Sequence, residues 1–167
     1  MRVLGLDPGY ATTGVAVIER DRATFRHLMS GAITTPPGRS QSARLAILWA
    51  ELNDLIAHHH PEVVAIERLF FNSNVKTAMA VGQASGVALA AAAQAGLEVH
   101  EYTPPEVKQS VVGVGSASKH QVQAMVAAIL SLPSPPSPPD AADACALAIC
   151  HINRSGLAAA LAKQVAR

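Results

Sequence analysis

The sequence predicts one α/β domain in which a five-stranded mixed sheet carries helices on both faces. Its 167 residues are enough for one domain that buries a sizeable core without disulfides or metals. Half of the residues are hydrophobic and only 15% are charged, which excludes an intrinsically disordered chain. Three predicted strands come first, and helices and strands then alternate, an order that is typical of a mixed sheet.

The first three strands are short apolar segments separated by turns. We expect them at residues 2–7, 13–19 and about 23–34, with Pro8-Gly9 marking the first turn. The connections are too short to hold helices, so these strands should form an antiparallel meander.

Helical and extended patterns alternate after Pro36-Pro37-Gly38. A helix begins at Ser40 with leucines on one stripe and ends at His58-His59-His60, before Pro61. The strand that follows should lie parallel to an earlier strand because a helix separates them. The elements after the first helix are a strand at 62–67, a helix at about 74–95, a strand at 97–102, a short helix from Pro104, a helix at about 118–132, a proline-rich stretch at 133–139, and a helix at 140–152 followed by a tail to 167.

The predicted helix at 74–95 is rich in Ala and Gly and apolar nearly all round. Such a helix is expected to be buried, either in the core or against another subunit. Its Gly82-x-x-x-Gly86 motif would let another backbone approach closely.

Composition also bears on location and charge. No run of about 18 strongly apolar residues occurs, so we expect no membrane span. Asp7 interrupts any signal-peptide core, so we expect no export and a cytoplasmic protein. Cys145 and Cys150 point to different faces of one predicted helix and are expected to be small buried residues. The formal net charge of +1 does not by itself indicate a nucleic-acid binder.

Four carboxylates stand at the ends of apolar elements. Asp7 and Glu67 each end a strand, and these strands are expected to be neighbours. Asp140 and Asp143 begin a helix three residues apart, so they project from one face. A carboxylate that ends a buried strand is costly unless it is satisfied, and Mg²⁺ and Mn²⁺ prefer such oxygen ligands. We therefore predict a site for two divalent cations, an arrangement that supports in-line phosphoryl displacement.

Each acid has a simpler interpretation when it is taken alone. Asp140 follows two prolines and is a good helix N-cap, with Asp143 in the first turn. Asp7 precedes Pro-Gly and could be a turn residue, while Glu67 could pair with Arg68 or with a lysine. The combination of the four favours the metal site.

Several motifs follow one another from residue 2 to about residue 152. They are Leu6-Asp7-Pro8-Gly9 with Thr13-Gly14, Ala65-Ile66-Glu67, Val107-Lys108-Gln109, Gly113-Val114-Gly115-Ser116-Ala117 with Lys119, and Asp140-Ala141-Ala142-Asp143-Ala144. Together they closely resemble the RuvC family of Holliday-junction resolvases. The first motif alone is less specific, because sugar kinases and actin-like ATPases open in the same way.

The resemblance implies a ribonuclease-H-like fold and a homodimeric, Mg²⁺-dependent endonuclease. Such an enzyme nicks two like-polarity strands of a four-way junction symmetrically and leaves ligatable ends. A RuvA–RuvB branch-migration complex is the further partner that the resemblance implies. In this chain the four metal-binding acids would be Asp7, Glu67, Asp140 and Asp143; the basic residues near them would be Lys108 and Lys119, and Phe70 would contact bases at the crossover.

The residues themselves indicate further DNA contacts. Lys108 and Lys119 do not belong to a lysine-rich solvated face, and each would act as a point charge near phosphate. Phe70-Phe71 follow the strand that ends in Glu67, where one ring could stack on an unpaired base and the other could plug the core. Because the net charge is small, we predict salt-dependent binding that relies on junction shape. The basic residues that could line one face are Arg2, Arg39, Arg44, Arg68, Lys76, Lys108 and Lys119.

The histidines are not expected to form a metal site. Adjacent residues of a helix point in different directions, so His58-His59-His60 should instead sit at a helix C-terminus. We expect His120 on the surface and His151 in a structural role.

Two other classes of function stay open. An actin-like phosphotransferase or ATPase shares the opening motif but needs a second nucleotide-binding half and usually a much longer chain. A junction-binding module that has lost catalysis would keep the fold, although the presence of all four acids argues against it.

Overall fold

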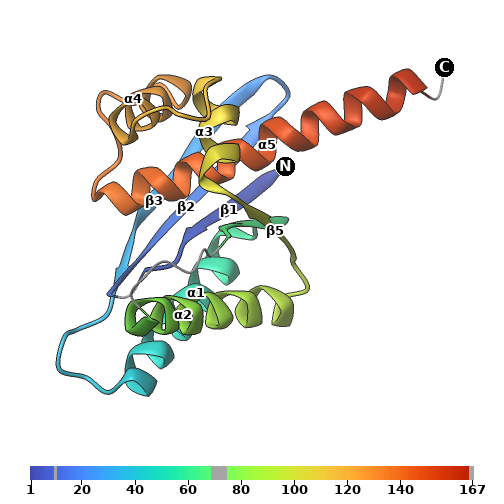
Figure 1. The fold of residues 1–167 in the computed structure, drawn as a ribbon. Helices are drawn as coiled ribbons and strands as arrows, with labels where there is room; N and C mark the ends of the chain where they lie inside the picture. The colour runs from blue at the N-terminus through green and yellow to red at the C-terminus, as the bar shows by residue number, and fades with distance from the viewer. Residues whose placement is uncertain (10, 69–74, 166–167) are drawn as a thin grey trace.

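The computed structural model describes residues 1–9, 11–68 and 75–165, apart from the side chains of 75–76 and 158–165. Its sheet has the strand order β3-β2-β1-β4-β5 (Figure 1). β1 to β3 form the expected antiparallel meander, and β4 and β5 add in parallel. The predicted topology is confirmed. The strands are β1 (Arg2–Asp7), β2 (Thr12–Asp21), β3 (Thr24–Thr34), β4 (Val63–Glu67) and β5 (Glu98–Tyr102).

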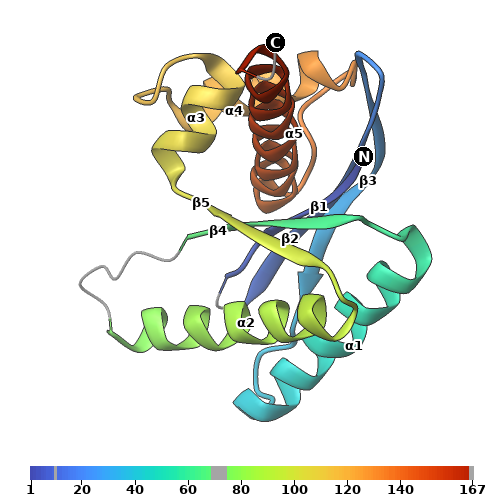
Figure 2. The same cartoon turned by 90° about the vertical axis from the view of Figure 1, so that its right-hand side faces the viewer.

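Helices cover both faces of this sheet (Figure 2). Two of them lie on one face and three on the other, so the sheet separates two hydrophobic clusters. Leu4 and Leu6 of β1 point into the cluster on the face covered by two helices, whereas Val3 points into the cluster on the face covered by three, because successive strand residues face opposite sides. The helices are α1 (Gln41–His59) and α2 (Val75–Gln94) on one face, and α3 (Pro104–Val112), α4 (Lys119–Ile129) and α5 (Pro139–Val165) on the other.

Two glycines let α5 lie directly on the backbone of the sheet. A Cβ atom at Gly5 of β1 would overlap the carbonyl oxygen of Ala144, and a Cβ atom at Gly14 of β2 would overlap that of Asp140. Glycine is required at both positions because helix and strand backbones approach so closely. The start of α5 is thereby placed over the ends of β1 and β2.

Capping side chains begin the helices near the sheet end that holds Asp7 and Glu67. Thr103 and Glu106 form a capping box at the start of α3, and Ser118 and Gln121 form another at the start of α4. Each box satisfies backbone N–H groups that the first helical turn leaves unpaired. These caps fix where α3 and α4 begin.

One expectation about the helices is wrong. α5 continues to Val165, well past the predicted end near Ile152. Within this chain α2 is buried on one side only, since Met79 is 61% exposed and the space beside Gly86 is open, so the core alone does not bury this helix. The alternative, burial of that side against another subunit, remains a prediction.

Other features agree with the sequence. Cys145 and Cys150 are buried free thiols. His60 caps the C-terminus of α1 in the left-handed conformation. Within the described part of the chain, no helix is long and apolar enough to cross a membrane.

Candidate metal centre and nucleic-acid interface

Asp7 and Glu67 lie side by side at one edge of the sheet. β1 and β4 are parallel neighbours with Leu6 opposite Ile66, so the next residue of each strand is an acid at the same end. Both strands are buried up to this point, and both acids are partly buried. This juxtaposition was predicted from the sequence.

The first turn of α5 brings two more acids to the same place. One carboxylate oxygen each from Asp7, Asp140 and Asp143 lie within 4.8 Å of one another. All three residues are partly buried. The close seat of α5 on Gly14 explains this convergence, since the helix backbone at Asp140 rests on the strand that pairs with Asp7.

Burial and the neighbouring acids raise the pKa values of Asp7 and Glu67. The pKa of Asp7 is raised from 3.8 to about 7, first by burial and then by the charges of Glu67, Asp143 and Asp140. Burial also raises the pKa of Glu67, and a hydrogen bond with Asp7 partly opposes this. Up to about pH 7, Asp7 and Glu67 therefore share a proton that an isolated aspartate would lose, because several negative charges lie close together at this site.

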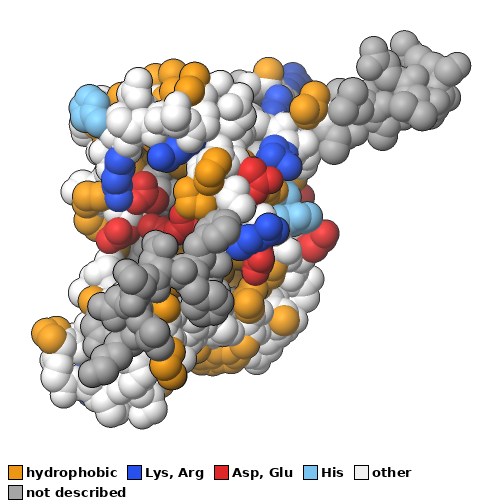
Figure 3. All heavy atoms as spheres, in the orientation of Figure 1, with side chains coloured by type: hydrophobic (Ala, Val, Ile, Leu, Met, Phe, Trp, Pro, Cys, Tyr) orange, Lys and Arg blue, Asp and Glu red, His pale blue; other side chains and the backbone are white. Residues whose placement is uncertain are grey.

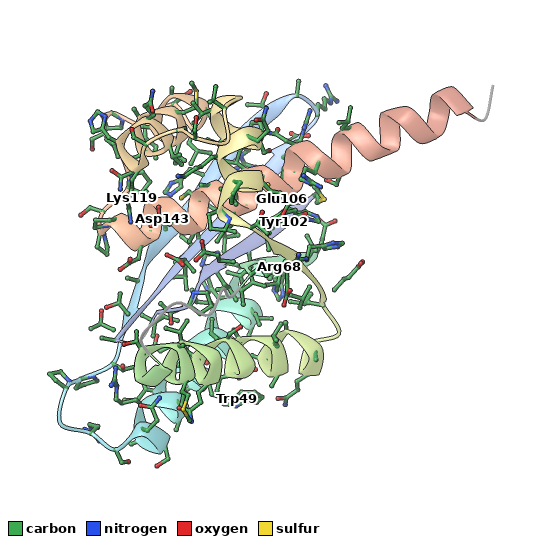
Figure 4. All side chains as sticks on the ribbon, in the orientation of Figure 1. Trp49, Arg68, Tyr102, Glu106, Lys119 and Asp143 are labelled. Atoms are coloured by element: carbon green, nitrogen blue, oxygen red, sulfur yellow. The ribbon has the colours of Figure 1, made fainter. Side chains whose placement is uncertain are left out.

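A cleft of about 250 Å³ opens beside the acids and contains both lysines that the motifs indicated. Lys108 comes from α3, and Lys119 comes from the first residue of α4. Lys119 Nζ donates a hydrogen bond of 2.6 Å to Asp143 Oδ2, and this bond raises the pKa of Lys119 (Figure 4). Figure 3 shows acidic side chains gathered on this face with Lys and Arg side chains beside them.

The donor set fits a hard divalent cation. Carboxylate oxygens are the ligands that Mg²⁺ and Mn²⁺ prefer, and the acids come from rigid strand and helix ends. The raised pKa of Asp7 indicates uncompensated negative charge, which a bound cation would neutralise.

Arg68 lies away from the cleft. It is exposed, and its Nε lies 3.4 Å from Glu101 Oε2 on the neighbouring strand. The pairing of Glu67 with Arg68 is therefore not seen; Lys119 is the basic residue whose charge acts on Glu67. Phe70 and Phe71 lie outside the described residues, as does the side chain of Lys76, so these expected DNA contacts stay predictions.

Two arginines assigned to the basic face belong elsewhere. Arg44 is buried, and its Nε donates a hydrogen bond of 2.8 Å to Thr35 Oγ1. Arg2 stands at the other end of β1 from Asp7, where its Nη2 lies 3.0 Å from Glu19 Oε1. The proposed face is wrong for Arg44, which is buried, and Arg2 lies at the end of β1 away from the acids.

The cleft also has an apolar wall that the sequence analysis did not identify. Pro104, Val107, Val122 and Leu147 line it beside the acids. The sequence does contain an indication of this wall, since Val107 adjoins Lys108 and Val122 lies one helical turn after Lys119. Two other expectations hold: His120 is exposed and His151 is buried.

Comparison with known proteins gives one consistent result. The family described as "Crossover junction endodeoxyribonuclease RuvC" matches residues 3–151. A protein of that name from Ruminiclostridium cellulolyticum is 50% identical over 161 residues, which cover 96% of this chain and 97% of the relative. Another from Chloroflexus aggregans is 53% identical over 151 residues, covering 90% and 92%.

Solved structures agree with this result. The structure of Thermus thermophilus RuvC is similar with a TM-score of 0.87 at 35% identity, covering 95% of this chain and 97% of that chain. T. thermophilus RuvC in complex with a Holliday junction substrate is similar with a TM-score of 0.87 at 33% identity, covering 94% and 96%.

Proposed function

Since the chain belongs to the RuvC family of crossover junction endodeoxyribonucleases, we propose that it resolves four-way DNA junctions by nicking two strands of like polarity. The observation that carries this proposal is the convergence of carboxylate oxygens from Asp7, Asp140 and Asp143 within 4.8 Å. Phosphodiester hydrolysis at such a site needs divalent cations, and two Mg²⁺ ions, or Mn²⁺ in their place, are the proposed cofactors.

Asp7, Glu67, Asp140 and Asp143 are the proposed metal-binding residues. Bound cations would polarise the scissile phosphate and favour ionisation of an attacking water. The acids themselves need rigid spacing, which the ends of β1 and β4 and the first turn of α5 supply. The proton held between Asp7 and Glu67 must leave their carboxyl oxygens when cations bind, because cations and protons compete for the same lone pairs.

Lys108 and Lys119 are proposed to bind phosphate next to these acids. Both line the cleft, and Lys119 is held in place by its hydrogen bond to Asp143. A lysine fixed there is a point charge that can stabilise the extra negative charge on a phosphate under attack. Val107 and Val122 line the same cleft, where their apolar side chains would strengthen these interactions by lowering the local dielectric constant.

A synthetic four-way junction with one labelled strand per reaction tests this proposal. With Mg²⁺ the protein should place paired nicks at symmetric positions in opposite strands, and ligase should reseal them. With EDTA the junction should remain intact, and a linear duplex of the same arm sequence should remain intact with Mg²⁺. Binding without nicks under every metal condition would indicate an inactive junction-binding module, and ATP hydrolysis without nicks would indicate a phosphotransferase.

Several finer assignments complete the proposal. A homodimer is supported by the need to cut two strands and by the exposed side of α2, where Met79 is 61% exposed. Family membership supports a RuvA–RuvB branch-migration complex as a partner, and a chromosomal substrate supports a cytoplasmic location. The proposed DNA contacts also include Phe70, Phe71, Arg68 and Lys76. Residues 1–167 are proposed to form one nuclease domain.

A further inference from the structure

A buried hydrogen bond joins the sheet to α5 at a distance from the metal centre. The hydroxyl group of Tyr102, at the end of β5, lies 2.8 Å from Nδ1 of His151. Tyr102 is 7% exposed and His151 is 5% exposed, so solvent does not compete for this bond. In Figure 4, Tyr102 lies alongside α5, and Asp143 lies further along the same helix.

Each residue of this hydrogen bond is connected through its own strand or helix to a proposed metal ligand. Tyr102 stands opposite Glu67 in the register of β4 and β5, and its carbonyl oxygen accepts the N–H of Arg68 at 2.8 Å. His151 follows Asp143 by eight residues on one helix, which is about 12 Å along its axis. A shift of α5 at His151 is therefore a shift of Asp143 relative to Glu67.

α5 approaches β1 and β2 through close backbone contacts at Gly5 and Gly14. Its buried face consists mainly of small apolar side chains, among them Ala141, Ala144, Cys145 and Ala148, which rest on glycine-containing strands. Steric contact at the glycines limits the distance of α5 from β1 and β2, and the Tyr102–His151 hydrogen bond adds a constraint on distance and angle between α5 and β5.

Other polar contacts of α5 reach α3, α4 and the sheet. Asn153 Nδ2 donates to the carbonyl oxygen of Ser110 at 3.2 Å, and Arg154 Nη2 lies 3.4 Å from Glu106 Oε1. Tyr102 and His151 make a buried 2.8 Å hydrogen bond between β5 and α5, on the strand next to the one that carries Glu67. The Cys145 thiol of α5 also interacts with Ser30 of β3.

The protonation states of the pair suit this bond. Burial, and then the neighbouring His100, lowers the pKa of His151 to about 4, so the ring is neutral near pH 7. Burial raises the pKa of Tyr102 to about 12, so its hydroxyl group keeps its proton. With the imidazole proton on Nε2, Nδ1 accepts the hydrogen bond from the tyrosine.

We propose that Tyr102 and His151 are positioning residues that fix α5 on the sheet and thereby set the spacing between the strand acids and the helix acids. This inference rests on the proposed function of the four carboxylates as metal ligands. Neither residue touches the metal centre; both act through the elements that carry Glu67 and Asp143.

Manganese binding tests the inference without relying on cleavage. We would titrate Mn²⁺ into the full chain and follow free Mn²⁺ by electron paramagnetic resonance, well below the melting temperature. The variants are Tyr102→Phe, which removes the hydroxyl group alone, His151→Ala, and His151→Asn, whose side-chain oxygen can replace Nδ1 as acceptor. Ile152→Val is the matched control, because it trims a fully buried neighbour on α5 without removing a hydrogen bond.

Tyr102→Phe and His151→Ala should weaken Mn²⁺ binding by roughly three- to tenfold, and His151→Asn should restore most of the affinity. The Mg²⁺ concentration needed for half-maximal nicking should rise by a similar factor. Ile152→Val should keep the wild-type affinity even where it lowers the melting temperature. Should Tyr102→Phe not fold, the two His151 variants make the same comparison.

The inference is overturned if Tyr102→Phe binds Mn²⁺ as tightly as the wild type, or if His151→Asn is as weak as His151→Ala. A purely structural bond would give that first result, with a loss of stability alone. Failure of the wild-type protein to bind Mn²⁺ at all is a different outcome, because it would overturn the proposed metal centre itself.

Discussion

Replacing Asp7 with asparagine should stabilise the metal-free protein while it abolishes nicking. In the unfolded chain the carboxyl group of Asp7 loses its proton near pH 3.8, whereas in the folded protein it keeps the proton until about pH 7. Between these pH values the folded state binds more protons than the unfolded state, so raising the pH destabilises the fold, and the loss is complete above pH 7.

The size of this effect follows from the pKa shift. Each pKa unit corresponds to about 1.4 kcal/mol, and the shift of Asp7 corresponds to about 4 kcal/mol before solvent screening. Because Asp7 is only partly buried, we expect about 2–4 kcal/mol at pH 8. Asp7→Asn removes the charge and keeps the shape, so it should recover most of that free energy of unfolding.

Urea denaturation in EDTA at pH 8 and pH 4 measures the difference. Asp7→Asn should exceed the wild type at pH 8 and approach it at pH 4, where the wild-type carboxyl group is protonated in the folded state. Asp54→Asn, an exposed change on α1, is the control and should alter stability little at either pH. With Mg²⁺ present, Asp7→Asn should bind a four-way junction and leave it uncut.

The reasoning is refuted if Asp7→Asn is no more stable than the wild type at pH 8 in EDTA. It is also refuted if the difference between the two proteins is the same at both pH values. Nicking at the wild-type rate would remove Asp7 from the proposed catalytic residues.

Three further predictions concern α5, the cleft and α2. Gly5→Ala should lower the free energy of unfolding by about 3 kcal/mol in urea denaturation, because its Cβ meets the backbone of Ala144, whereas Gly31→Ala, with open space, should be nearly neutral. Lys119→Met should slow junction nicking by roughly 10- to 100-fold in a single-turnover assay while changing stability by less than about 1 kcal/mol, since its ion pair is largely exposed. Met79→Glu should convert a dimer to a monomer in light scattering, and an unchanged mass would contradict the proposed interface on α2.

The acids could be predicted from the sequence because they interrupt strong patterns. Asp7 and Glu67 each end a fully apolar strand, and the order of elements made those strands parallel neighbours. What the sequence did not reveal is why α5 lies close enough for Asp140 to join them. That closeness depends on the backbone packing at Gly5 and Gly14, which no side-chain pattern reports.

Two wrong expectations have physical causes that can be traced to particular residues. Arg44 was assigned to the surface because it is charged, yet it precedes Leu48 and Leu52 at intervals of four on the buried stripe of α1. α5 runs past the expected end near Ile152 because the residues after Gly156 are mainly alanine, leucine and lysine, which favour helix.

α5 follows all the strands along the chain, and this order matters during translation. The ribosome completes Asp7 and Glu67 long before it reaches Asp140 and Asp143, and α5 also supplies much of one hydrophobic cluster. A nascent or truncated chain that lacks this segment therefore has neither a complete set of ligands nor a covered sheet. Unfinished molecules should be harmless to the genome, since the capacity to cut DNA arises only after α5 has been translated.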